Sequence, residues 1–184
     1  MHAALFLDRD GVIIENRPDY VRSWSDVSIY PQALAALARI AESPFKIVIV
    51  TNQSVINRGR MTLAHAESIN TRLIKAINRA GGRIDGVFMC PHTPEERCPC
   101  RKPRPGLILQ AAGVLQLDLS RSILIGDALS DIEAGRNAGL LHLALVLTGR
   151  GAAQLAAFHR TSNNLPFLVF DSLSAALADL IPTD

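Results

Sequence analysis

The chain has 184 residues, of which 48% are hydrophobic and 20% charged, and its formal net charge is +2. This length suits one domain covering residues 1–184, and the composition is typical of a globular protein with a proper core. The small net charge, without a basic block, argues against nucleic acid as a partner. No apolar run approaches a membrane span, and the first apolar segment begins too close to Met1 for a signal peptide. We therefore expect a cytoplasmic protein with no membrane partner.

Strands and helices are predicted to alternate along the chain. Apolar, β-branched runs predict strands at 5–7, 47–50, 87–89, 122–125, 141–147 and 169–170. Between them, apolar periodicity predicts five helices. The first starts at Pro31 and ends before Pro44, and the second starts after Thr62 and ends at Gly81. The other three start at Pro105, at Ser130 or Asp131, and after Asp171 or Ser172. Residues 15–29 form an excursion after the first strand, and residues 149–164 are weakly patterned. This alternation predicts an α/β fold with a doubly wound parallel sheet.

Polar side chains follow four of the predicted strands, directly at the strand end in three cases and by way of the Cys/His loop in the third strand's case. In a parallel sheet these ends lie along one edge, so we expect the side chains to meet in one cleft. They are Asp8 and Asp10, Thr51 and Asn52, Arg101 and Lys102, and Asp127 and Asp131. Carboxylates, a hydroxyl and two cations in one crevice suit a divalent cation together with a phosphate group.

The same groups indicate a reaction at phosphorus. A carboxylate attacks a phosphate only when Mg²⁺ and a lysine, here Lys102, screen the phosphate's negative charge. The Thr51 hydroxyl can hold a phosphoryl oxygen, and a second carboxylate can protonate the leaving oxygen and later activate water.

All three cysteines fall within an 11-residue segment that also contains a histidine. Three thiolates and one imidazole make a closed tetrahedral set, which is the pattern of a structural zinc site. The expected ligands are Cys90, His92, Cys98 and Cys100. The alternative is a set of buried, unconnected cysteines. A zinc ion here would stiffen the loop that delivers Arg101 and Lys102 to the cleft.

Four of these segments, taken in order, resemble the motifs of the haloacid dehalogenase (HAD) superfamily of phosphotransferases. The segments are LFLDRDGVI, VTNQS, Lys102 in RKP, and GDALSD. The resemblance implies a three-layer sandwich in which Asp8 is the nucleophile and Asp10 the general acid/base. It also implies Mg²⁺ bound by Asp8, the Asp10 backbone carbonyl and Asp127, with Asp131 supporting this set from outside.

The Cys/His loop is similar to that of a small, nearly capless branch of this superfamily, which contains heptose 1,7-bisphosphate and histidinol-phosphate phosphatases. The short interval between the first two motifs agrees with a fold lacking a separate cap domain. TNQS followed by Arg58 and Gly59 resembles the heptose enzymes, whereas the five-residue gap between His92 and Cys98 is more similar to the histidinol group. Val55, Asn57 and Ala128 depart from the heptose pattern.

The expected partner is therefore a small phosphorylated metabolite bound by a monomer. Residues 17–20 either form a flap over this substrate or a plain surface loop, and Arg58 either binds a second phosphate or is simply exposed. The predicted substrate contacts are Asn52, Gln53, Ser54, Arg58, Arg101 and Tyr20.

Two other classes of protein stay open at this point. A signalling receiver domain also combines Asp, Thr, Lys and Mg²⁺ on a doubly wound sheet, but its phosphorylated Asp follows the third strand. A zinc-containing binding module without activity is the other alternative, although the four complete motifs argue against it.

Overall fold

The computed structural model describes residues 1–160 and 165–182 of the chain. Within them, one sheet of parallel strands runs in the order β3-β2-β1-β4-β5-β6. The strands are β1 (Ala4–Leu7), β2 (Lys46–Asn52), β3 (Gly86–Cys90), β4 (Ile123–Gly126), β5 (His142–Val146) and β6 (Leu168–Phe170). The predicted doubly wound sheet is confirmed.

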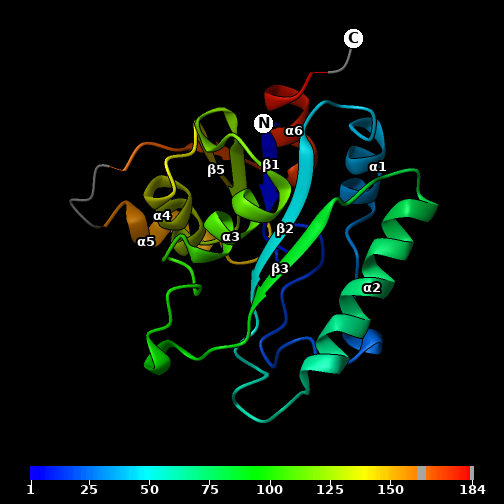
Figure 1. Cartoon of the computed structure of the whole chain (residues 1–184), viewed down its shortest axis with the longest axis vertical. Coiled ribbons are helices and arrows are strands. Elements are labelled where there is room, and N and C mark those ends of the chain that lie inside the picture. Colours follow the sequence, from blue (N-terminus) through cyan, green and yellow to red (C-terminus); the bar gives the residue numbers. More distant parts are fainter. Residues whose placement is uncertain (161–164, 183–184) are drawn as a thin grey trace.

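Helices cover both faces of this sheet, as Figure 1 shows. Helices α1 (Pro31–Arg39), α2 (Leu63–Arg79) and α6 (Leu173–Leu180) pack on one face, and α3 (Gly106–Leu115), α4 (Leu129–Asn137) and α5 (Gly151–Phe158) on the other. None of these helices is both long and apolar enough to cross a membrane. The chain thus forms three layers.

The central strands are apolar on both sides because both faces of the sheet are covered. In β1, Leu5 and Leu7 pack in the core beneath α1, α2 and α6, while Ala4 and Phe6 pack in the core beneath α3 and α4. Side chains alternate across a strand, so a continuous apolar run is needed to fill both cores. This explains why β1 and β2 read as unbroken hydrophobic segments.

Several helix ends agree with the sequence. Pro31 is the first residue of α1, the Thr62 hydroxyl accepts a hydrogen bond from the His65 backbone N–H at 3.2 Å, and Ser172 caps α6. Other ends were predicted wrongly. Helix α1 stops at Arg39 and a turn follows at residues 40–42, so Pro44 does not end it. Helix α3 begins at Gly106, with Pro105 at its N-cap position. Helix α4 begins at Leu129, and Ala128 occupies its N-cap position.

The weakly patterned segment after residue 148 contains a helix, α5, that the periodicity did not predict. It is short and rich in alanine, so its apolar residues mark no distinct face. Residues 161–164 of that segment lie outside the described residues.

The strand order places a switch point beside β1. The chain moves from β1 to β2 and β3 on one side, then returns to β4, β5 and β6 on the other. In open α/β sheets, ligands bind at such a point, beyond the carboxyl ends of the strands. The loops after β2 and β3 both lie at the lower end of the molecule in Figure 1. Receiver domains have the order 2-1-3-4-5, so this sheet is not that of a receiver.

The interval between β1 and α1 holds no separate domain. Within residues 8–30 the chain forms a tight turn and one short 3-10 helix, Trp24–Asp26. Gly11 in that turn has a φ of +84°, and a Cβ there would overlap the Asp127 carboxylate. Only glycine allows both this conformation and this close approach.

Candidate active site

A cavity of about 640 Å³ opens at the carboxyl edge of the sheet. The side chains expected to be catalytic or to touch substrate all line it, and they come from the end of β1 and the excursion after it, from the end of β2 and the loop after it, and from the loop after β3. They are Asp8, Asp10, Tyr20, Thr51, Asn52, Gln53, Ser54, Arg58, Arg101 and Lys102. Arg17 and Pro18 also line it, so the excursion after β1 borders the cavity. Asp131 lies at its wall as well.

Lys102 connects two of the carboxylates. Its ammonium lies 2.9 Å from Asp8 Oδ1 and 2.5 Å from Asp131 Oδ1, and it also donates to the Val50 carbonyl at 2.8 Å. All three charged side chains are buried. Such a buried group is stable only when each charge is paired and hydrogen-bonded, as it is here.

The pairing changes the acidity of both partners. Burial raises the pKa of Asp8 to about 6, outweighing the opposing attraction of Lys102, and the nearby carboxylates of Asp131 and Asp10 raise it further. Burial alone would lower the pKa of Lys102, but Asp131 and Asp8 together raise it above its usual value. Lys102 is therefore a permanent positive charge at the bottom of the cavity.

Asp10 is held from two sides. Gln53 Nε2 donates to its Oδ2 at 2.9 Å, and Arg9 Nε lies 3.0 Å from the same oxygen. Arg9 is fully buried and is anchored by Asn70 of α2 at 2.8 Å. The burial of Arg9 was not predicted, because an arginine after a strand is usually solvated.

The β2 end positions the loop that carries Lys102. Asn52 Nδ2 donates to the Lys102 carbonyl and Asn52 Oδ1 accepts from the Lys102 N–H, both at 3.1 Å. Thr51 Oγ1 accepts from Gln53 Nε2 at 2.9 Å, which leaves the threonine O–H free to donate. Asn52 thus supports Lys102 in addition to lining the cavity.

Asp127 lies behind this wall and is paired with Arg150, a residue that we had not singled out. Arg150 Nη2 is 3.0 Å from Asp127 Oδ1, and Arg150 also lines the cavity. The strand-end rule that identified the other residues would have found it, because Arg150 follows β5 closely. Burial raises the pKa of Asp127, and the neighbouring Asp8 charge adds to this, against the opposing effect of Arg150.

The three carboxylates Asp8, Asp127 and Asp131 offer oxygens that all lie within 4.8 Å of one another. Oxygen ligands of this kind are those that Mg²⁺ prefers in proteins. The donor set therefore fits a hard divalent cation. The Asp10 side chain is outside this set, so Asp10 is left with its backbone carbonyl as a candidate ligand.

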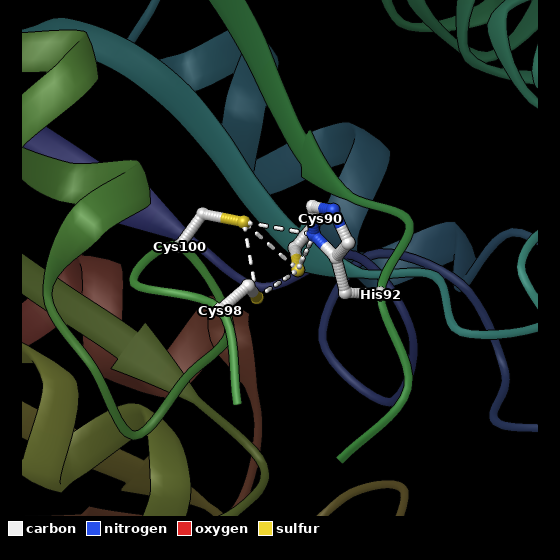
Figure 2. A group of neighbouring side chains, drawn as sticks. All are labelled: Cys90, His92, Cys98 and Cys100. Atoms are coloured by element: carbon white, nitrogen blue, oxygen red, sulfur yellow. Dashed lines mark hydrogen bonds between the residues drawn. The ribbon is translucent and has the colours of Figure 1, made fainter. Parts of the chain in front are cut away.

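The cysteines and His92 converge as predicted (Figure 2). Cys100 Sγ lies 3.1 Å from Cys90 Sγ, 3.4 Å from Cys98 Sγ and 3.3 Å from His92 Nδ1. Sulfur ligands about 2.3 Å from a central zinc ion lie about 3.7 Å apart in a tetrahedron, so the four atoms need to move little to hold one. Buried but unconnected cysteines would not share one centre.

The Cys/His loop is also attached to the neighbouring loop after β2. Asn57 Nδ2 donates to Glu96 Oε1 at 2.8 Å, and Gln53 N donates to the Cys90 carbonyl at 2.7 Å. Asn57 is one of the departures from the heptose pattern, and here it joins the two loops. Arg101 Nη1 donates to the His92 carbonyl at 3.0 Å, which fixes that side chain at the cavity.

Comparison with known proteins gives a consistent result. A family model described as HAD-hydrolase-like matches residues 99–176. A D-glycero-beta-D-manno-heptose-1,7-bisphosphate 7-phosphatase of Pseudomonas aeruginosa is 35% identical over 179 residues, covering 96% of this chain and 97% of the relative. The Helicobacter pylori (strain J99) protein of the same name is 44% identical over 136 residues, which is 73% of this chain and 78% of that protein.

Among solved structures, D,D-heptose 1,7-bisphosphate phosphatase from B. bronchiseptica, crystallised with magnesium and phosphate, superposes with a TM-score of 0.89. It is 34% identical and the match covers 97% of this chain and 98% of that one. The fold and the site thus define a phosphatase of the HAD-like class. Within that class, the chain belongs to the family of D-glycero-beta-D-manno-heptose-1,7-bisphosphate 7-phosphatases.

Proposed function

We propose that the protein is a Mg²⁺-dependent phosphomonoesterase that removes the 7-phosphate of D-glycero-D-manno-heptose 1,7-bisphosphate. The observation that carries this proposal is the meeting of Asp8, Asp10 and Lys102 in one cavity, in a chain whose relatives of 35–44% identity bear that name. We further propose that it acts as a cytoplasmic monomer made of one domain.

In the first step, Asp8 attacks the phosphorus atom and the bond to the sugar oxygen breaks. Asp10 gives its proton to the leaving oxygen, so an aspartyl-phosphate and a free hydroxyl result. In the second step, Asp10 takes a proton from water, which attacks the aspartyl-phosphate and releases inorganic phosphate. Arg9 and Gln53 hold the Asp10 carboxylate in place for both transfers.

The remaining groups bind the transferred phosphoryl. The Thr51 hydroxyl and Ser54 donate to its oxygens, and Lys102 neutralises charge on both the phosphoryl and Asp8. Asp8, the Asp10 carbonyl and Asp127 would hold Mg²⁺, with Asp131 supporting from outside, and the bound ion would screen the negative charge that otherwise repels Asp8.

Arg58 and Arg101 are proposed to bind the distal part of the substrate, including its second phosphate, together with Tyr20. Both arginines line the same cavity as Asp8, and guanidinium groups suit phosphate oxygens. We also propose that Cys90, His92, Cys98 and Cys100 hold a structural zinc ion. This ion leaves no open coordination position and therefore takes no part in the chemistry.

Histidinol phosphate is the second candidate substrate, because the gap between His92 and Cys98 is short. Phosphate release from heptose 1,7-bisphosphate of both anomers, heptose 7-phosphate, histidinol phosphate and common hexose phosphates separates the two. We expect the highest kcat/KM for a heptose bisphosphate, by at least about tenfold. A higher kcat/KM for histidinol phosphate would overturn the heptose assignment while leaving the phosphatase assignment intact.

A further inference from the structure

The turn between β5 and α5 packs directly against Asp127. Thr148 Oγ1 donates to the Gly11 carbonyl at 2.6 Å, and the Arg150 backbone N–H donates to Asp127 Oδ2 at 2.8 Å. A Cβ on Gly149 would overlap both Asp127 Oδ2 and Gly11 Cα. The backbone at Gly149 therefore passes so close to this carboxylate that only glycine fits there. This close approach places the side chain of the next residue, Arg150, beside Asp127.

That next side chain, Arg150, covers both oxygens of the carboxylate. Its Nη2 lies 3.0 Å from Asp127 Oδ1 and its Nε 3.3 Å from Asp127 Oδ2. Lys102 is already shared between Asp8 and Asp131, so it does not pair with Asp127. Arg150 thus supplies the positive charge next to a carboxylate that is fully buried.

The two cations differ in their freedom to move. The Lys102 side chain is 3% exposed and its ammonium is also bound to the Val50 carbonyl. The Arg150 side chain is 50% exposed, and all the hydrogen bonds described for its guanidinium go to Asp127. The Arg150 guanidinium can therefore move into water once another cation takes its place at Asp127, whereas Lys102 is enclosed among its partners.

We infer that Arg150 is a stand-in cation, which neutralises Asp127 before the divalent metal binds and is displaced when the metal arrives. The inference rests on the proposed Mg²⁺ site at Asp8 and Asp127. A buried carboxylate needs a partner of opposite charge. Arg150 holds the Asp127 carboxylate in position through hydrogen bonds to both oxygens, and it therefore competes with Mg²⁺ for the same two oxygens. It is a positioning residue that acts through Asp127.

The test is a calorimetric Mg²⁺ titration of the whole protein as wild type and as Arg150→Gln, Arg150→Lys and Asp127→Asn. We expect Arg150→Gln to bind Mg²⁺ about fivefold more tightly, because the ion no longer has to displace a half-exposed ion pair from Asp127. Arg150→Lys keeps a competing charge and should bind Mg²⁺ nearly as the wild type does. Arg121→Gln, an exposed arginine outside the cavity, is the matched control for the change in net charge.

Thermal unfolding with and without Mg²⁺ separates this role from a merely structural one. We expect Arg150→Gln to lower Tm in the absence of Mg²⁺ and to match the wild type at saturating Mg²⁺. An equal loss of Tm in both conditions, or unchanged or weaker Mg²⁺ binding, would overturn the inference. Wild-type Mg²⁺ affinity in Asp127→Asn would instead show that the proposed metal site itself is wrong.

Discussion

At the scale of single residues, the site depends on a charge balance. Three buried carboxylates are matched by two cations, with Lys102 serving Asp8 and Asp131 and Arg150 serving Asp127. Each carboxylate would be costly to bury without a cation beside it. Changes to these residues should therefore affect both folding and chemistry.

Replacing Lys102 tests this balance. Lys102→Met leaves two buried carboxylates without their cation, so we expect unfolding free energy to fall by about 3–5 kcal/mol and turnover to be lost. Lys46→Met is the matched control, because Lys46 makes a 3.4 Å pair with Asp85 near the surface and should cost about 1 kcal/mol or less. Urea unfolding measures both. Equal losses in the two variants would contradict the account.

The raised pKa of Asp8 gives a second test. In Mg²⁺-free protein, carboxyl NMR should show Asp8 titrating near pH 6. Because the folded state binds this proton more tightly than the unfolded state, the contribution of Asp8 to stability should decline as pH rises from about 4 to about 6. Added Mg²⁺ should shift the titration of Asp8 to lower pH, and a midpoint that does not respond to Mg²⁺ would place the ion elsewhere.

At the scale of elements, two adjacent loops build most of the cavity wall. The Cys/His loop carries Arg101 and Lys102, and the end of β2 and the loop after it carry Thr51 to Arg58. Asn52 and Asn57 hold these loops together. A metal in the Cys/His cluster would therefore act on the chemistry only indirectly, through the position of Lys102.

Metal analysis tests the cluster. We expect purified protein to contain about one equivalent of zinc, and Cys98→Ser to lose most of it and to lose turnover that added Mg²⁺ does not restore. Glu95→Gln, a change at an exposed residue in the same loop, should keep both zinc and turnover. A clearly substoichiometric zinc content with all four ligands intact would argue against the zinc site.

Arg58 tests the proposed distal contact. Arg58→Gln should raise KM for heptose 1,7-bisphosphate about tenfold and leave KM for heptose 7-phosphate unchanged, because the latter has no second phosphate. Arg60 lies in the same loop but not at the cavity, so Arg60→Gln should behave as the wild type. An equal effect of Arg58→Gln on both substrates would assign Arg58 another role.

Periodicity and strand-end chemistry predicted the elements that carry strong signals. Strands β1 and β2 could be predicted because both faces of the sheet are covered, so that these strands are unbroken apolar runs. The spacing of the cysteines and His92 was distinctive enough to predict that they form one cluster. Helix α5 lacked a signal because its alanines define no face. The burial of Arg9 depends on Asn70, 61 residues away, and such a long-range pairing leaves no local pattern.

At the scale of the whole molecule, the doubly wound sheet explains why residues so far apart in sequence meet. Asp8, Thr51, Lys102 and Asp127 lie at or beyond the carboxyl ends of four different strands, and the parallel arrangement brings all four strand ends to one edge. The switch point beside β1 opens the cavity there. With no separate domain between β1 and α1 in the described residues, selectivity must come from the loops that border the cavity.

The central claim is turnover through Asp8, and ³¹P NMR of heptose 1,7-bisphosphate with Mg²⁺ tests it most directly. Wild-type protein should convert the 7-phosphate signal to inorganic phosphate while the 1-phosphate signal stays. Asp8→Asn, which keeps shape but removes the nucleophile, should leave both signals unchanged while remaining folded. Turnover by Asp8→Asn would contradict the account, as would wild-type protein that becomes phosphorylated once without turnover or releases no phosphate.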